Sequence, residues 1–143
     1  MPSYAHTETI AAPPSVVFAI LDDFSRTPEW QTRCTGIDKL EDGPNQVGTP
    51  LRYRFRDGRR TGDMTGEITQ REQDGRLTLH FVDKLTEVTV DFKTAAMGEE
   101  TSLTHEIEVR TKGFGKLFTP MIKRSLPNQT LDSMSRLRAL AEA

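Results

Sequence analysis

Three tight-turn signals divide the middle of this chain into a ladder of short segments. They are Asp57-Gly58, Asp74-Gly75 and Gly98, and the residues between them alternate between apolar and polar. Strict alternation is typical of β-strands with one dry and one wet face. Connections this short join antiparallel neighbours, because a parallel return needs a crossover of a dozen or more residues. The ladder therefore predicts an antiparallel meander, which limits the fold to a few classes.

Helical patterns lie on both sides of this ladder. A helix is predicted from Pro13-Pro14 through Leu21, followed by a short helical turn over residues 24–30 that carries the single Trp. The last helix is predicted over residues 116–141, with a kink or restart before Pro127. The predicted strands cover residues 4–10, 34–41, 50–56, 60–72, 76–82, 85–95 and 100–111. The order of these elements indicates an α+β fold.

Composition excludes several classes of protein. The 143 residues fit one domain, residues 1–143, and the net charge of −2 with a pI near 5.9 gives no global attraction to nucleic acid or to an anionic membrane. The chain shows no secretory signal pattern at its start and no apolar stretch long enough to span a membrane. With one cysteine there is no disulfide framework. We expect a cytoplasmic protein, either a monomer or a weak homodimer.

Common catalytic and metal-binding patterns are missing from the sequence. His6, His80 and His105 lack metal-ligand spacing, so neither a metal nor a cofactor is predicted. Cys34 has no evident base beside it and is interpreted as a structural thiol. The arginines at 52, 54 and 56 alternate onto the wet face, where Glu67 or Asp63 could pair with them.

The last predicted strand places a histidine on its dry face. Alternation directs Leu103, His105, Ile107 and Val109 inward, whereas Thr104, Glu106 and Glu108 face solvent. One interpretation is a core histidine that hydrogen-bonds to Tyr53 or to a backbone carbonyl. The other is a polar anchor or general base on the wall of a ligand pocket, with the Tyr53 phenol as its companion. The residues leave both open.

The opening of the chain resembles that of a known superfamily. An apolar strand, the run Ala12-Pro13-Pro14, a helix ending in Asp22-Asp23 and the later Pro28-Glu29-Trp30 are similar to the START/polyketide cyclase superfamily (SRPBCC). The resemblance implies a helix-grip fold: a curved antiparallel sheet of about seven strands wrapped around a long C-terminal helix, with two short helices after the first strand. Pro127 departs from the usual unbroken last helix.

A curved sheet gripping one helix predicts a cavity between them that accepts a small apolar ligand, such as a lipid, polyketide-like or aromatic metabolite. Alternatives are a cyclase or dehydratase that uses His105 and Tyr53, or a co-chaperone-like interaction domain. Residues predicted to line the cavity, by alternation and by position on the last helix, are Trp30, Tyr53, Phe55, Met64, Ile68, Leu79, Phe81, Val90, Phe92, Leu103, His105, Phe114, Phe118, Met121 and Ile122.

Overall fold

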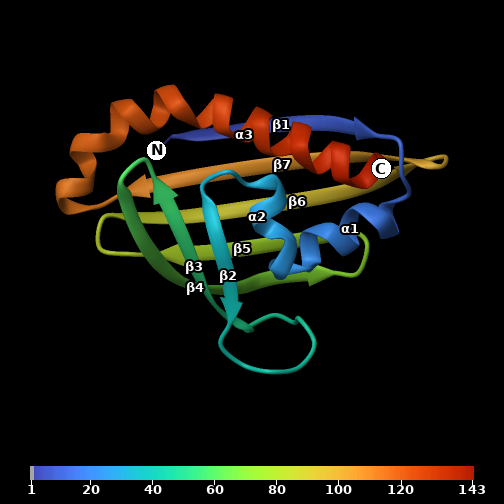
Figure 1. Ribbon diagram of the computed structural model, residues 1–143, viewed down its shortest axis with the longest axis horizontal. Coiled ribbons are helices and arrows are strands. Elements are labelled where there is room, and N and C mark those ends of the chain that lie inside the picture. Colours follow the sequence, from blue (N-terminus) through green and yellow to red (C-terminus); the bar gives the residue numbers. More distant parts are fainter. Residues whose placement is uncertain (1) are drawn as a thin grey trace.

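A computed structural model of the chain describes residues 2–143 and shows a curved sheet covered on one side by helices (Figure 1). Met1, the first residue of the predicted domain, lies outside the described residues. The strands are β1 (Ser3–Ile10), β2 (Cys34–Lys39), β3 (Pro50–Asp57), β4 (Arg60–Glu72), β5 (Arg76–Val82), β6 (Thr86–Met97) and β7 (Glu100–Thr111). The helices are α1 (Pro14–Asp22), η1 (Phe24–Arg26), α2 (Thr27–Trp30), η2 (Gly113–Phe118) and α3 (Thr119–Glu142), where η marks a 3-10 helix.

All strand pairs are antiparallel, in the order β1-β7-β6-β5-β4-β3-β2. Consecutive strands from β2 to β7 are neighbours, and β1 returns to pair with β7, with His6 directly opposite His105. This topology confirms the predicted α+β helix-grip fold. The bounds of β4, β5 and β7 agree with the sequence prediction, while β2 ends two residues earlier than predicted.

Of the helices after β1, α1 begins where the sequence predicts, and the single helical turn predicted over residues 24–30 is divided into η1 and α2. Pro14 occupies the start of α1, where its missing N–H is not needed, and α1 buries Val17, Phe18, Ile20 and Leu21. Asp23 ends this helix and caps the next one, since its carboxylate accepts from the backbone N–H of Ser25 at 3.1 Å. This turn sets the direction of α2, which carries Thr27 and Trp30 into the core.

The C-terminal helix α3 is one element of 24 residues with Pro127 inside it. The predicted restart therefore does not occur, although in Figure 1 the orange first part of α3 rises at an angle to the red remainder. Its buried face comprises Leu126, Thr130, Met134, Leu137 and Ala141, at spacings of three and four residues. Met134, Leu137 and Ala141 belong to the main hydrophobic core, and α3 packs onto β1 and α2.

Strand β7 confirms the period-two pattern. Leu103, His105 and Val109 are buried, Ile107 packs against the core, and Glu106 is exposed. A slip of one residue would have reversed every side chain. His105 therefore lies on the inner face of the sheet.

Candidate functional site

Three aromatic rings form a continuous row across the inner face of the sheet. The ring of His105 stacks on that of Phe92 on the next strand, with centroids 4.4 Å apart and planes at 24°. Phe92 in turn meets the edge of Trp30 from α2, with centroids 5.8 Å apart and planes at 80°. Trp30 and His105 are only 2% and 3% exposed. We call Trp30, Phe92 and His105 the aromatic row.

The polar atoms of this row have no hydrogen-bond partners. Among the described residues, no group hydrogen-bonds to either ring nitrogen of His105 or to the indole nitrogen Nε1 of Trp30. The hydroxyl of Thr27, one helical turn before Trp30, also has no hydrogen-bond partner there. Buried polar groups in native proteins are normally paired, and an unpaired one costs about 1–3 kcal/mol. Four such atoms on the aromatic row and the adjoining turn of α2 therefore need a functional or structural explanation.

Burial keeps His105 uncharged at neutral pH. Desolvation, and to a smaller extent the charge of His6, lowers the pKa of His105 from its usual 6.5 to about 4, although Asp91 acts in the opposite direction. A neutral imidazole has one N–H donor and one acceptor nitrogen. The ring can therefore bind both a donor and an acceptor group of a ligand.

Tyr53 is not the companion of His105. Its hydroxyl donates to the side-chain oxygen of Gln31 at 3.0 Å, and its ring packs against Phe81 at 5.2 Å. Strands β4, β5 and β6 lie between the strands of Tyr53 and His105. The interpretation of His105 as a core histidine bonded to Tyr53 or to a backbone carbonyl is therefore wrong. Sequence reasoning missed Gln31, because nothing in its local pattern distinguishes it from an ordinary polar residue.

Most other predicted cavity residues do lie on the inner face. Buried members are Met64, Ile68, Leu79, Phe81, Val90 and Leu103, and Tyr53 and Phe55 are partly buried against the core.

The prediction fails at the junction of η2 and α3. Phe114 and Met121 are 81% and 60% exposed, Phe118 is at the surface and Ile122 is only partly buried. Helical periodicity shows which residues share a face, but it does not show which way that face points.

Cys34 is buried at the start of β2, as predicted for a structural thiol. Burial raises its pKa to about 11, so the unreactive thiol form prevails at neutral pH. On the outer face, Arg54 pairs with Asp38 of β2 at 3.0 Å, and not with the predicted Asp63 or Glu67.

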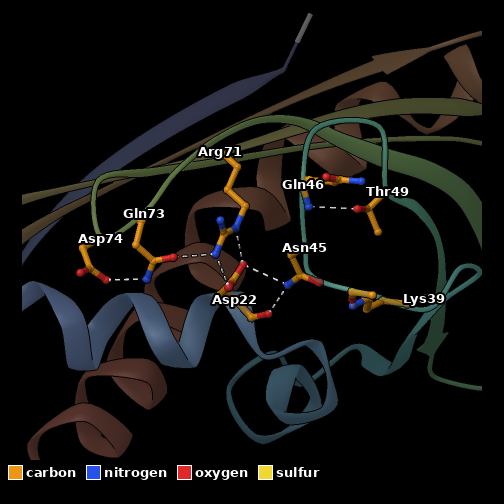
Figure 2. Close-up of polar contacts among 9 residues, drawn as sticks. Asp22, Lys39, Asn45, Gln46, Thr49, Arg71, Gln73 and Asp74 are labelled. Atoms are coloured by element: carbon orange, nitrogen blue, oxygen red, sulfur yellow. Dashed lines mark hydrogen bonds and ion pairs between the residues drawn. The ribbon is translucent and has the colours of Figure 1, made fainter.

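A hollow of about 680 Å³ lies between the end of α1 and the loop after β2. Figure 2 shows the polar cluster beside it, where Arg71 donates to both carboxylate oxygens of Asp22 at 3.0 and 2.8 Å. Asn45 donates to the same carboxylate and to the backbone oxygen of Asp22, and Arg71 also reaches Gln73. Burial alone would raise the pKa of Asp22, but these hydrogen bonds from Arg71 and Asn45 lower it. We call Asp22, Asn45, Arg71 and Gln73 the Asp22 cluster.

The Asp22 carboxylate is paired within the protein, with Arg71 and Asn45. Arg71 also lies over the ring of Phe18 at 5.4 Å, so that the cluster joins α1, β4 and the loop after β2. Sequence reasoning missed this ion pair, because 49 residues separate its partners. This arrangement indicates a structural role, in which the cluster holds these three elements together.

A second hollow of about 550 Å³ lies beside the β5–β6 turn. There Asp83 accepts hydrogen bonds from the backbone N–H groups of Leu85 and Thr86, which is ordinary turn chemistry. None of the predicted ligand-binding residues lines either hollow. The enclosed cavity between sheet and helix stays a prediction.

The fold and the sequence together decide the family. Residues 1–142 match the family described as polyketide cyclase/dehydrase and lipid transport. The chain belongs to this family. The predicted membership of the START/polyketide cyclase superfamily is thereby confirmed, whereas no curated protein matches the chain in sequence.

Solved structures agree on the fold at low sequence identity. The protein TTHA0849 from Thermus thermophilus has a TM-score of 0.79 at 12% identity, covering 98% of this chain and 97% of its own. The Zhui aromatase/cyclase from Streptomyces sp. R1128 also has a TM-score of 0.79, at 16% identity, covering 98% and 93%. A START superfamily protein from Mycobacterium smegmatis has 0.73 at 18%, covering 94% and 92%. Likeness at these identities establishes the fold alone.

The structure also bears on membrane-spanning helices and on metal-binding clusters. No helix within residues 2–143 is long and apolar enough to cross a membrane. In the same residues, His, Cys, Asp and Glu side chains do not gather in threes at a spacing that could hold a metal ion.

Proposed function

We propose that this protein binds a small, mostly apolar ligand between the sheet and α3, and that the aromatic row recognises a carbonyl or hydroxyl group on it. The observation that carries the proposal is the set of buried, unpartnered polar atoms on Thr27, Trp30 and His105. Membership of a family described as polyketide cyclase/dehydrase and lipid transport supports the same class of ligand.

The chemistry of these atoms defines what the ligand offers. Trp30 Nε1 can only donate, and neutral His105 donates from one nitrogen and accepts at the other. A carbonyl oxygen would accept from Trp30 or His105, and a hydroxyl could bond in both directions. The surrounding apolar side chains favour a ligand whose remaining surface is aliphatic or aromatic.

Binding fits these residues better than turnover. A general base is normally oriented by a second group, yet no described side chain bonds to either nitrogen of His105. Its pKa of about 4 also makes it a weak base at neutral pH. Tyr53, the proposed second catalytic group, bonds to Gln31 instead. The cyclase or dehydratase alternative therefore lacks its assembled acid–base pair.

A pair of probes of similar size tests the polar recognition. 2-Acetonaphthone and 2-ethylnaphthalene differ mainly in one carbonyl oxygen, and their binding is measured by calorimetry. We expect the wild type to prefer the ketone by about twofold to tenfold, which corresponds to one net hydrogen bond. His105→Leu should reduce that preference while still binding the hydrocarbon.

Thr104→Val, on the opposite face of β7, is the control and should keep the wild-type preference. Equal affinity of the wild type for both probes would contradict the polar recognition, and no binding of either would contradict the cavity. Mass spectrometry of ligands that copurify with the protein gives the natural compound. Turnover of a polyketide-like substrate, lost in a His105→Leu variant that still binds it, would favour the cyclase instead.

A further inference from the structure

Four large apolar side chains are exposed together where η2 meets α3. Phe114, Leu117 and Met121 are 81%, 78% and 60% exposed, and Phe118 is 37% exposed. Phe114 and Leu117, three residues apart, lie on the same side of the 3-10 helix η2, and Phe118 and Met121 are three residues apart where α3 begins. Isolated exposed apolar residues are common, but a contiguous set of this kind marks an interaction surface.

The backbone of this segment is fixed to the end of the sheet. Lys112 donates its N–H to the carbonyl oxygen of Leu85 in the β5–β6 turn at 2.8 Å. Gly115 is buried against the same carbonyl, so closely that a side chain at this position would collide with it. Figure 1 shows η2 and the start of α3 at the end of the molecule where the β5–β6 turn lies. The apolar side chains are therefore held outward by the fold.

The segment that carries these side chains holds charges of one sign only. Residues 111–124 contain Lys112, Lys116, Lys123 and Arg124 but no Asp or Glu, although the whole chain has a net charge of −2. Arg60, from the start of β4, adds a further cation, with its guanidinium 6.0 Å from the centre of the Phe118 ring. The net charge of the whole chain thus conceals a basic segment with exposed apolar side chains, although Asp83 lies in the adjoining β5–β6 turn and Glu87 of β6 interacts electrostatically with Lys112.

We propose that residues 112–124 form a docking surface for a bilayer that contains anionic phospholipid. Phe114, Leu117 and Met121 would enter the boundary between headgroups and acyl chains, while Lys116, Lys123 and Arg124 bind lipid phosphates. Segments that combine Phe and Leu with Lys and Arg lie at bilayer surfaces in this way. The inference does not depend on whether the protein carries a ligand.

A lipid surface explains this composition better than an acidic protein does. Lysine is depleted in protein–protein interfaces, and three of the four cations within the segment are lysines. Each Lys or Arg near an anionic leaflet contributes attraction without needing a fixed partner. Insertion into a bilayer also needs no complementary pocket for protruding side chains such as Phe114 and Leu117.

Cosedimentation with vesicles tests the proposal on the full chain. Vesicles of phosphatidylcholine are compared with vesicles in which one third of the lipid is phosphatidylglycerol, at low and at high salt. We expect binding to the anionic vesicles only, weakened by salt. Phe114→Ser with Leu117→Ser should reduce binding by about a hundredfold, and Lys116→Glu with Lys123→Glu by about tenfold or more.

The matched controls change the same chemistry elsewhere on the surface. Leu40→Ser with Val47→Ser removes two apolar residues that are also exposed, after β2. Arg52→Glu with Lys93→Glu reverses two exposed charges on β3 and β6. Both control pairs should bind like the wild type. Equal losses in test and control pairs, or no preference of the wild type for anionic vesicles, would overturn the proposal.

A fluorescent reporter separates membrane insertion from closure of the segment onto its own protein. The only native Trp, Trp30, is buried, so Phe114→Trp adds one exposed reporter. Its emission should move to shorter wavelength when anionic vesicles are added. Emission already at short wavelength without lipid, or a shift caused by an acidic protein but not by vesicles, would refute docking on lipid.

Discussion

The Asp22 cluster and the aromatic row both place polar groups out of bulk solvent, but only one of them pairs those groups. In the Asp22 cluster the carboxylate receives two hydrogen bonds from Arg71 and one from Asn45 (Figure 2). In the aromatic row, both nitrogens of His105 and Nε1 of Trp30 lack partners among the described residues. The first region lies beside a solvent-open hollow, and the second is closed within the core.

This contrast suggests different roles for the two regions: the Asp22 cluster stabilises the fold, and the aromatic row is the candidate for ligand binding. In the Asp22 cluster the carboxylate is already bonded to Arg71 and Asn45, so these residues join α1, β4 and the loop after β2. An unpaired group in an apolar setting destabilises the empty protein and is relieved by a ligand that supplies the bond. For this reason we place the proposed ligand recognition at the aromatic row and not at the hollow beside the Asp22 cluster.

Of the predicted effects, the largest is the loss of folding stability at acid pH, which should come from the aromatic row before it comes from the Asp22 cluster. The pKa of His105 is about 4 in the native protein, below its usual 6.5, so the unfolded chain takes up the proton first. Stability is therefore unaffected by this group above about pH 6.5 and falls as the pH drops towards 4, by roughly 3 kcal/mol in total. Urea unfolding of wild type and His105→Leu, measured from pH 7 to pH 4.5, should show a steeper loss of stability in the wild type.

The Asp22 cluster acts in a lower pH range. Because the native pKa of Asp22 is below 3.8, its contribution is intact above that value and is lost only as the pH falls further. His6→Gln is the control for the pH experiment, since His6 lies opposite His105 and makes the smaller contribution to its shift. The slope should persist in His6→Gln. A slope of the same size in His105→Leu would contradict the assignment to His105.

Breaking the ion pair of the Asp22 cluster should give the next largest effect. Arg71→Met keeps an apolar stem against Phe18 but leaves the Asp22 carboxylate with Asn45 alone. The two charged side chains are each 20% exposed, so we expect a loss of about 2 kcal/mol, less than for a fully buried pair. Chemical denaturation at pH 7 measures it.

Two further variants test whether the loss comes from the Asp22–Arg71 ion pair itself. Arg54→Met breaks an ion pair whose side chains are about half exposed, and it should cost only a few tenths of a kcal/mol. Asp22→Asn added to Arg71→Met should recover part of the loss, because the unpaired charge is removed. If Arg71→Met and Arg54→Met cost the same, the cluster is no more than a surface ion pair.

The strands could be predicted from the sequence because their signal is local. Asp-Gly pairs mark the turns, and alternation gives the buried face, so the bounds of β4, β5 and β7 and the inward position of His105 were all predictable. The resemblance of the first thirty residues to a known superfamily then gave the closure of the sheet around a helix. Local pattern and fold agree in this part of the chain.

The partners of the polar groups could not be predicted, since they depend on contacts between distant residues. Arg71 reaches Asp22 across 49 residues, and Tyr53 reaches Gln31 across 22. Similarly, the periodicity of Phe114, Phe118 and Met121 indicates one apolar face but not its direction. Those side chains point outward because the backbone of Gly115 packs directly against the β5–β6 turn.

The smallest expected effect uses one substitution at two buried threonines. Thr101 donates its hydroxyl to the backbone oxygen of Ala12 at 2.7 Å, whereas the hydroxyl of Thr27 has no partner among the described residues. Thr101→Val leaves a buried carbonyl without its donor and should cost about 1–2 kcal/mol. Thr27→Val removes an unpaired hydroxyl and should stabilise the ligand-free protein by about 0.5–1 kcal/mol.

Thermal unfolding of the two variants, each compared with the wild type, measures both changes. Because volume and branching change in the same way at both sites, opposite signs would come from hydrogen bonding and not from packing. Destabilisation by Thr27→Val would mean that this hydroxyl is paired in solution. The unpaired groups of the core would then be confined to Trp30 and His105, and the recognition site would shrink to the aromatic row itself.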